Sequence, residues 1–553
     1  MKPVSTTASG SRGVRRRTVL AGLAATAVAG PLSTIVAKAA DDGPELRVAM
    51  QDFYGEQLDP IIGGSNSNYL MLQGLYDGAF EINPETGEVA PGIVKAWETA
   101  PDGLSWTFHL RDDVVFHDGS KLTADDLAYS YGRAVSKEAT YGSNWRSMLG
   151  DTPNIEVLDP YTLRIHTAVP QPLLAYSSAA PANEPYLVIF PKAYIEKNGI
   201  DNFRAHPIGS GPYKFVSHTP GDNIQFAAVD YPHWSGVTPD FKRLTLYLVP
   251  EESTRKSMIE TDQIDVIEAS METAKTLKDE GFGTFSGMVA LARFWTFGAY
   301  RPQAKGLPLA DVRVREALSL AINRQEIIDT MFYGQAQMPP PSAGATPDMT
   351  AATRQKWADW SKQAYRYDPD AAKKLLADAG YPDGFSFDFW SVPDSSAPFL
   401  ADLVLAVAGY WEKLGIHANV TAADKAAYRQ VRTTSKSPAL IGKMACDASP
   451  VNRLGRIDFV IWTSQYGVLD FLAESPDIKE FDADYLEAKS SMDPAHTADL
   501  LERMVEISTA SWCCLPIVAA PGFYANGRHV SLTYPVWGQG LGKYFAQWKH
   551  VQS

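Results

Sequence analysis

The segment from Leu75 to Arg133 constrains the fold more than any other part of the chain. A short alternating run, Ala79–Ile82, stops at the sequence Asn-Pro-Glu-Thr-Gly, in which proline fixes one φ and glycine allows a positive one. A second alternating run, 106–110, follows an Asp-Gly pair, and Thr123 then precedes a helical stretch with two aspartates in its first turn. Strands joined by tight reversals and followed by a helix predict a mixed α/β fold.

The first residues predict export. Five basic residues and no acid precede an Ala- and Gly-rich apolar run from Val19 to Val36, as in a signal peptide. Arg16–Leu20 matches the twin-arginine pattern, and 37–39 reads Ala-Lys-Ala, so residues 1–39 are predicted to be a twin-arginine export signal. A retained membrane anchor is the alternative, although proline and hydroxyl residues interrupt the run. No cysteine lies near the cleavage sequence. We therefore expect a soluble periplasmic protein without a lipid anchor.

Charge and length exclude several classes of protein. The net charge is -14, and removal of a leader with six basic residues and no acid leaves about -20 on the same counting. Such a surface repels phosphates, so nucleic-acid binding is not expected. A mature chain of about 510 residues is too long for one core and predicts two or three domains. No Walker A pattern for nucleotide binding occurs.

No catalytic, metal or cofactor pattern stands out. The Gly-Ser-Gly around Ser210 lacks the spacing of a nucleophile elbow. His109 and His117 are expected in neighbouring strands, without the cysteines or carboxylates of a metal site. Glu251 and Glu252 are adjacent, and side chains of neighbouring residues at a strand end point in opposite directions. A hydrolase hypothesis therefore has no nucleophile or acid pair on which to rest.

The three cysteines are Cys446, Cys513 and Cys514. An odd number leaves at least one thiol without an internal partner. A disulfide between neighbouring residues is strained, so buried thiols are the expected state. A bridge from Cys446 to either of the others is the alternative.

Three later segments predict helices. Asp311–Arg324 places apolar residues at helical spacing. Asp368 precedes a proline and an apolar stretch that stops at Gly380, which is the order of N-cap, first turn and C-cap. Asp493, also followed by proline, is expected to open a helix that runs to about Thr509.

Three other segments predict strands. Pro207–Phe215 places glycines directly before an alternating run, where they permit a tight backbone. An apolar strand is expected over 289–297, and residues 515–518 are expected to form a strand that returns the chain to its first half. Together with Leu58-Asp59-Pro60 and Glu45–Met50, these motifs in this order resemble solute-binding proteins of family 5, the dipeptide and oligopeptide group that serves ABC transporters.

The resemblance implies an α/β fold with two lobes, a type II periplasmic binding protein of cluster C with an extra subdomain in lobe I. It places the first part of lobe I at 40–290, its extra subdomain at about 77–200, lobe II at 291–510 and a return to lobe I at 511–553. Two strands crossing between the lobes would form a hinge, about which the lobes close over a ligand.

The resemblance also implies a ligand anchor in lobe II. Peptide-binding members hold the ligand's ammonium group on an aspartate in a segment that usually reads Gly-Trp-x-Ala-Asp-Tyr-x-Asp-Pro. Asp447 matches this anchor, but Met444 replaces the tryptophan, and Ala448 and Ser449 replace the aromatic residue and the second acid. These departures argue against an ordinary peptide pocket. Asp447 is expected either to contact the ligand or to be a loop or cap aspartate.

Aromatic side chains commonly line such pockets. Each of the candidates here could equally belong to the core, because aromatics make up 11% of the chain. Glu56 could pair with a cationic ligand or be a solvated surface acid. The predicted ligand-binding residues are Asp447, Tyr54, Phe53, Glu56, Trp462, Tyr466, Trp295 and Met444.

The resemblance implies the binding component of an ABC importer. It would capture a small polar ligand, a peptide or a peptide-like compound, and deliver it to a permease and ATPase complex in the inner membrane. A monomer is expected. The alternatives are an exported enzyme or a signalling receptor on the same scaffold, or a binding protein for an opine, an oligosaccharide or a metal chelate.

Overall fold

The computed structural model describes residues 43–53, 55–62, 72, 74–83, 88–140, 142–179, 187–296, 298–341, 349–391, 397, 399–422, 442–448, 472, 474–532 and 545–551. For 82, 144, 286–290, 303 and 442–448 it describes the backbone alone. All elements below belong to the unit formed by Gly43–Ser553.

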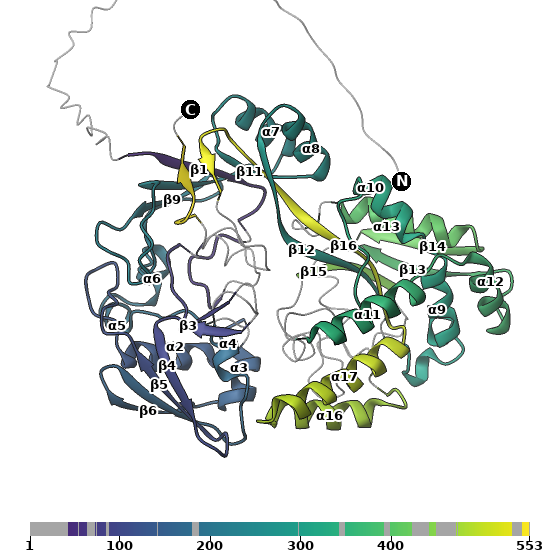
Figure 1. The fold of residues 1–553 in the computed structure, drawn as a ribbon, viewed down its shortest axis with the longest axis horizontal. Helices are drawn as coiled ribbons and strands as arrows, with labels where there is room; N and C mark the ends of the chain where they lie inside the picture. The colour runs from purple at the N-terminus through teal and green to yellow at the C-terminus, as the bar shows by residue number, and fades with distance from the viewer. Residues whose placement is uncertain are drawn as a thin grey trace, which may run out of the picture. The chain divides into compact units, whose positions relative to one another are not determined.

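Ten strands form one sheet, in the order β14-β13-β15-β12-β16-β11-β1-β10-β9-β8 (Figure 1). Strands from both ends of the sequence are neighbours in it, so the fold is mixed α/β with long-range pairing. Their bounds are β1 (Glu45–Met50), β8 (Tyr213–Thr219), β9 (Asn223–Ala228), β10 (Arg243–Leu248), β11 (Val266–Ala269), β12 (Gly283–Thr296), β13 (Phe385–Ser391), β14 (Ile416–Ala422), β15 (Gly442–Ala448) and β16 (Cys514–Asn526).

The predicted strand at 45–50 is confirmed as β1. It lies parallel to both β10 and β11, and a strand with parallel neighbours is usually covered on both faces. Leu46, Val48 and Ala49 are accordingly fully buried.

The segment from Leu75 to Arg133 contributes β2 to β5 of two small sheets and a helix, so the strands and the helix predicted there are confirmed. β2 (Phe80–Ile82) pairs with β3 (Val89–Pro91). A four-stranded sheet of order β4-β5-β7-β6 contains β5, whose alternating residues Trp106, Phe108 and Leu110 are buried. The bounds are β4 (Val94–Thr99), β5 (Ser105–Leu110), β6 (Asn154–Asp159) and β7 (Thr162–His166), and a third small sheet pairs β17 (Val530–Ser531) with β18 (Lys549–His550).

Among the helices of the first half, α2 and α4 pack against the small sheets, and α7 and α8 pack against inner strands of the large sheet (Figure 1). The bounds of the helices in this half are α2 (Ala124–Ala134), α3 (Gly142–Leu149), α4 (Leu174–Ser177), α5 (Lys192–Asn198), α6 (Ile200–Ala205), α7 (Glu252–Glu260) and α8 (Met271–Asp279). The helix expected after Thr123 is α2. The Asp126 carboxylate accepts a hydrogen bond from the Thr123 N–H at 2.9 Å and so holds the first turn.

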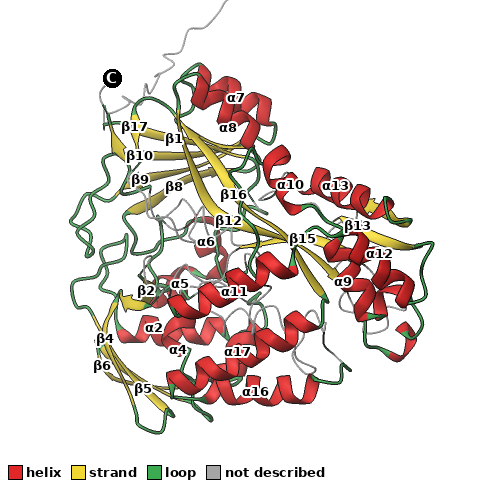
Figure 2. Cartoon of the chain, turned by 45° about the vertical axis from the view of Figure 1, so that its right-hand side comes forward, coloured by secondary structure: helices red, strands yellow, loops and turns green. Residues whose placement is uncertain are grey.

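The helices of the second half surround β13, β14 and β15, and α16 lies beside α17 (Figure 2). Their bounds are α9 (Val312–Leu320), α10 (Arg324–Met331), α11 (Ala351–Ala364), α12 (Pro369–Asp378), α13 (Leu400–Glu412), α16 (Ile478–Ser490) and α17 (Pro494–Ala510), with 3₁₀ turns at Pro302–Ala304 and Pro308–Ala310. Two predicted caps are confirmed. Asp368 accepts a hydrogen bond from the Ala371 N–H at 3.0 Å, and Asp493 accepts one from the Ala495 N–H at 2.9 Å.

The single helix expected over 311–324 is wrong, because the structure breaks it into α9 and α10. Asn323 has a non-helical backbone (ψ 85°) and caps α10 by accepting a hydrogen bond from the Glu326 N–H. The Leu320 carbonyl accepts from the N–H of Asp368 instead of continuing the helix. Apolar spacing alone does not reveal this cap, since the same spacing continues through the break.

Two long strands, β12 and β16, run antiparallel between the halves of the sheet (Figure 1). β12 also pairs with β15, and β16 also pairs with β11. The strand expected over 289–297 therefore begins earlier, at Gly283, and the strand expected at 515–518 extends to Asn526.

The buried apolar residues fall into separate clusters in the two halves. One contains Phe294, Phe389 and Trp411, with the rings of Phe294 and Trp411 5.0 Å apart at 72°. Another contains Phe53 and Trp548. Cys513 and Cys514 are buried, as expected, whereas the Cys446 side chain lies outside the described part.

Candidate functional site

The predicted anchor Asp447 lies in β15, the strand that adjoins β12 in the large sheet. Its backbone pairs with Leu291, and that of Met444 pairs with Phe294. The side chains of both residues are outside the described part of the chain. Asp447 is thus adjacent in the ladder to one of the two long strands, and its contact with a ligand stays a prediction, as does that of Met444.

Trp295 lies near the end of β12 with its side chain 2% exposed. The guanidinium carbon of Arg293 is 5.6 Å from the centroid of the Trp295 ring. Arg293 itself is 1% exposed and is two positions from Leu291, the backbone partner of Asp447. Arg293 was not among the residues predicted from the sequence. It is a single charge within an apolar strand, a pattern that indicates a charge buried with a partner.

The other candidates from the first half lie just after β1. Phe53 is 1% exposed and packs in the core around β1. Glu56 has a positive φ of 55° and accepts hydrogen bonds from the Gly221 N–H at 3.0 Å. The Glu56 carboxylate also lies 2.8 Å from His218 Nε2. It is therefore neither a freely solvated acid nor without a partner, and binding of a cationic ligand would compete with these contacts.

Tyr54, Trp462 and Tyr466 lie outside the described residues. A second residue that the sequence analysis missed is Glu268, in β11. Its carboxylate accepts a hydrogen bond from the Gln51 N–H at 3.0 Å, just past the end of β1, and burial raises its pKa. The carboxyl ends of parallel strands are common ligand sites in α/β sheets, and β1 and β11 are such a pair.

The prediction that His109 and His117 lie in neighbouring strands is wrong for His117. His109 lies in β5, whereas His117 lies in a turn before α2 instead of in a strand. His117 Nδ1 accepts from the Gly209 N–H at 3.1 Å, so its Nε2–H donates to the Gly211 carbonyl at 2.9 Å. Burial lowers the pKa of His117 to about 4, and the imidazole is neutral at pH 7.

Close backbone packing explains the glycines in the element that follows Pro207. A Cβ on Gly209 would lie 2.1 Å from the Leu75 carbonyl oxygen, and one on Gly211 would lie 2.4 Å from the Gly74 carbonyl oxygen. Only glycine permits this approach. The element therefore serves as scaffold, docking the segment that begins at Leu75.

Among the described residues, no group of three or more histidine, cysteine, aspartate or glutamate side chains is arranged to hold a metal ion. Likewise, none of the helices formed by these residues combines the length and apolarity needed to span a membrane.

Comparison with known proteins identifies the family. The model of bacterial extracellular solute-binding proteins, family 5, matches residues 88–451. The chain belongs to this family, and the resemblance inferred from its motifs is confirmed.

Relatives of known ligand are similar over about two thirds of the chain. Heme-binding protein A of Haemophilus influenzae is 28% identical over 407 residues, which cover 67% of this chain and 68% of the relative. The dipeptide-binding protein of Escherichia coli is 26% identical over 413 residues, covering 68% of this chain and 72% of the relative. A glutathione-binding protein of Salmonella paratyphi A is 28% identical over 370 residues, covering 66% and 67%.

Solved structures show the same fold. A periplasmic peptide-binding protein of Helicobacter pylori in complex with the peptide STSA has a TM-score of 0.72 at 20% identity, covering 92% of this chain and 98% of that chain. A substrate-binding protein of Listeria monocytogenes has a TM-score of 0.75 at 18% identity, covering 92% and 100%. The predicted two-lobed α/β fold is therefore confirmed, and the chain is a solute-binding protein of an ABC importer.

Proposed function

We propose that the protein captures a small polar, peptide-like ligand between its two lobes and hands it to an ABC permease and ATPase complex. The observation that carries this proposal is the position of Asp447 on the strand beside β12, in a chain of family 5. Contacts that span both lobes stabilise the closed state, and a site beside the crossing strands touches both. Relatives named for dipeptides and for glutathione support a ligand with an ammonium group.

We further propose the boundaries of the lobes and the route of export. Lobe I would comprise 40–290, with the extra subdomain at about 77–200, and 511–553, and lobe II would comprise 291–510. The boundary at 291 falls within β12 (Gly283–Thr296), and the boundary at 511 falls just before β16 begins at Cys514, so both lie at the two long strands. The twin-arginine motif supports export of a folded monomer to the periplasm, with residues 1–39 removed.

Thermal denaturation with candidate ligands tests the proposed ligand class. Binding to the folded state alone raises the melting temperature, so peptides and peptide-like compounds should raise it, together with any ligand found by native mass spectrometry. Opines, sugars and metal chelates form the comparison set. If only a non-peptide compound raises the melting temperature, the ligand class is wrong, and if the bound compound is chemically converted, the protein is an enzyme.

Substitution of the predicted anchor is the narrower test. Asp447→Asn should weaken binding of a cationic ligand by about tenfold or more, since a charge-assisted hydrogen bond to the ligand is lost. Asp388→Asn, in the exposed part of β13, is the matched control and should leave the affinity unchanged. Equal affinity of Asp447→Asn and the unmodified protein, measured by isothermal titration calorimetry, would remove Asp447 from the site.

A further inference from the structure

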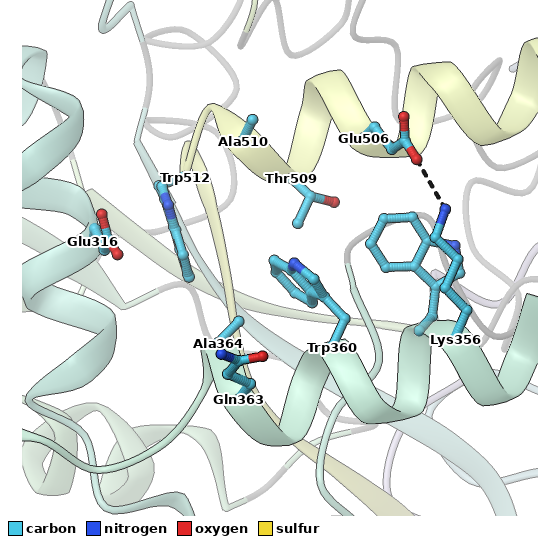
Figure 3. A pocket seen from close by; sticks show the side chains of 10 residues that line it. Glu316, Lys356, Trp360, Gln363, Ala364, Glu506, Thr509, Ala510 and Trp512 are labelled. Carbon is cyan, nitrogen blue, oxygen red and sulfur yellow. Dashed lines mark hydrogen bonds and ion pairs between the residues drawn. The ribbon is translucent and has the colours of Figure 1, made fainter.

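A pocket lies between α11 and α17, at the turn that leads into β16 (Figure 3). Its volume is about 560 Å³, which is the size of a site for a small organic molecule. It shares no residue with those predicted to contact the transported ligand. Its lining combines aromatic rings with acids: Glu316, Lys356, Trp357, Trp360, Gln363, Ala364, Glu506, Thr509, Ala510 and Trp512.

Ring contacts within the protein hold the aromatic wall of the pocket. The rings of Trp360 and Trp512 are 6.1 Å apart and inclined at 31°. Tyr365 contacts both edge-on, with its ring 5.3 Å from Trp360 and 6.2 Å from Trp512. Tyr365 is 2% exposed, so its own ring is held by the core. It therefore supports the two partly exposed tryptophans on the side that faces the protein interior. A ligand would therefore meet rings that need no reorganisation.

Trp512 adopts an uncommon backbone conformation. Its φ is 51°, a region that costs free energy for a bulky residue and is often retained at functional sites. The conformation places the indole in the pocket, opposite Trp360 (Figure 3). A glycine or asparagine would satisfy the turn more easily, but neither supplies an aromatic face.

The charged groups make the pocket negative. Lys356 Nζ donates to Glu502 at 2.6 Å and to Glu506 at 2.8 Å, so the lysine is already neutralised. Glu316 stands beside Trp512 at the other end of the pocket (Figure 3), and no cation among the described residues pairs with it. The three charged lining residues, two glutamates and one lysine, sum to one negative charge.

We propose that this pocket binds a small organic cation, an amine that carries short apolar substituents. The faces of Trp360 and Trp512 would hold the cation through their negative π-faces, and Glu316 would serve as its counter-ion. The acids at both ends disfavour anions, and a neutral ligand gains only the apolar contacts. The site is a second one, separate from the site for the transported ligand.

Calorimetric titration with choline and its neutral isostere 3,3-dimethylbutan-1-ol tests the charge requirement, because the two differ in charge but hardly in shape. Choline should bind saturably, and the isostere should bind about tenfold more weakly. Absence of saturable choline binding, or equal binding of both compounds, would overturn the proposal.

Variants locate the binding. Trp360→Ala should weaken choline binding about tenfold and Glu316→Gln about fivefold. Glu272→Gln, at an exposed glutamate of α8, is the matched control and should bind as the unmodified protein does. Glu316→Gln preserves the size of the side chain and should fold as the unmodified protein does. If circular dichroism shows that Trp360→Ala is unfolded, the choline affinity of Glu316→Gln is the test of the pocket.

A cation bound at the site of the transported ligand would respond differently. Asp447→Asn should leave the choline affinity unchanged. If that variant loses choline binding while Glu316→Gln keeps it, the proposed pocket is wrong, whereas the assignment of Asp447 is supported.

Discussion

Two buried sites, one in each half of the molecule, hold charge in different ways. In the first half, the fully buried carboxylate of Asp59 lies 2.8 Å from Arg133 and 3.2 Å from Arg204. In the second half, Arg324 is 1% exposed and donates hydrogen bonds to the carbonyls of Ser319, Tyr365 and Pro516 and to the Ser319 hydroxyl.

The contrast shows two uses of a buried arginine. An ion pair between a carboxylate and a guanidinium joins two side chains, and each buried charge needs the other to offset its loss of hydration. Arg324 instead joins three backbone segments, since its carbonyl partners come from the end of α9, the turn after α11 and β16. Arg315 does the same with the carbonyls of Leu309 and Ser511. Burial lowers the pKa of Arg324 to about 10, which still leaves it charged at pH 7.

Removal of Asp59 should have the largest effect. Asp59→Ala leaves the nearly buried Arg133 without its closest carboxylate, and we expect a loss of about 4 kcal/mol in the free energy of unfolding. Chemical denaturation measures this. Asp201→Ala is the control, because Asp201 also lies near Arg204 but is 97% exposed, and it should leave the denaturation midpoint unchanged. Similar denaturation midpoints for both variants would show that burial does not determine how much an ion pair contributes to stability.

Removal of Arg324 should cost less, because it leaves neutral carbonyls instead of a charge. Arg324→Met keeps the volume of the side chain and should lower the free energy of unfolding by about 3 kcal/mol. Arg313→Met, at an exposed position of α9, is the control. A loss larger than that of Asp59→Ala in the same denaturation experiment would reverse the proposed difference between the Asp59 and Arg324 sites.

The neutral His117 predicts a smaller, pH-dependent effect. Its folded pKa of about 4 lies below the ordinary value of 6.5, so the unfolded state binds more protons between these values and stability falls as the pH drops from about 6.5 to about 4. At pH 5 the loss should be about 2 kcal/mol.

Comparison with His117→Gln isolates this contribution. The variant should show a flatter dependence of the free energy of unfolding on pH over the same interval, measured by denaturation at pH 7 and pH 5. His417→Gln, whose histidine is 63% exposed, should retain the slope of the unmodified protein. If the free energy of unfolding of His117→Gln changes with pH as steeply as that of the unmodified protein, groups other than His117 cause the pH dependence.

Locally encoded features of the fold could be predicted from the sequence. Asp368 caps its helix through contacts within three residues, and Gly380 has the positive φ of 93° that ends it. Longer-range features could not be located in the same way. β12 begins at Gly283 because its backbone pairs with Asn526 of β16, and the sequence does not show which strands will be neighbours.

The candidate site was less predictable for a related reason. Phe53 and Trp295 are aromatic residues near expected strand ends, and both are buried in apolar clusters. Sequence patterns give the same signal for a core ring and a pocket ring. The pocket of Trp360 and Trp512 arises from residues 152 positions apart (512 - 360), so no local motif marks it.

The pairing of β12 with β16 shifts register at two places, between Ser286 and Val289 and between Ala292 and Arg293. At both, the facing residue of β16 is a proline, Pro521 opposite Val289 and Pro516 opposite Arg293, and proline supplies no N–H to the ladder. The pair of strands that joins the lobes thus has two points of weakened hydrogen bonding, with a short, regularly paired stretch between them. A bend distributed over two such points requires a smaller change of backbone angle at each than a bend at one point. The hydrogen bonds between the two points can therefore remain intact while the strands bend.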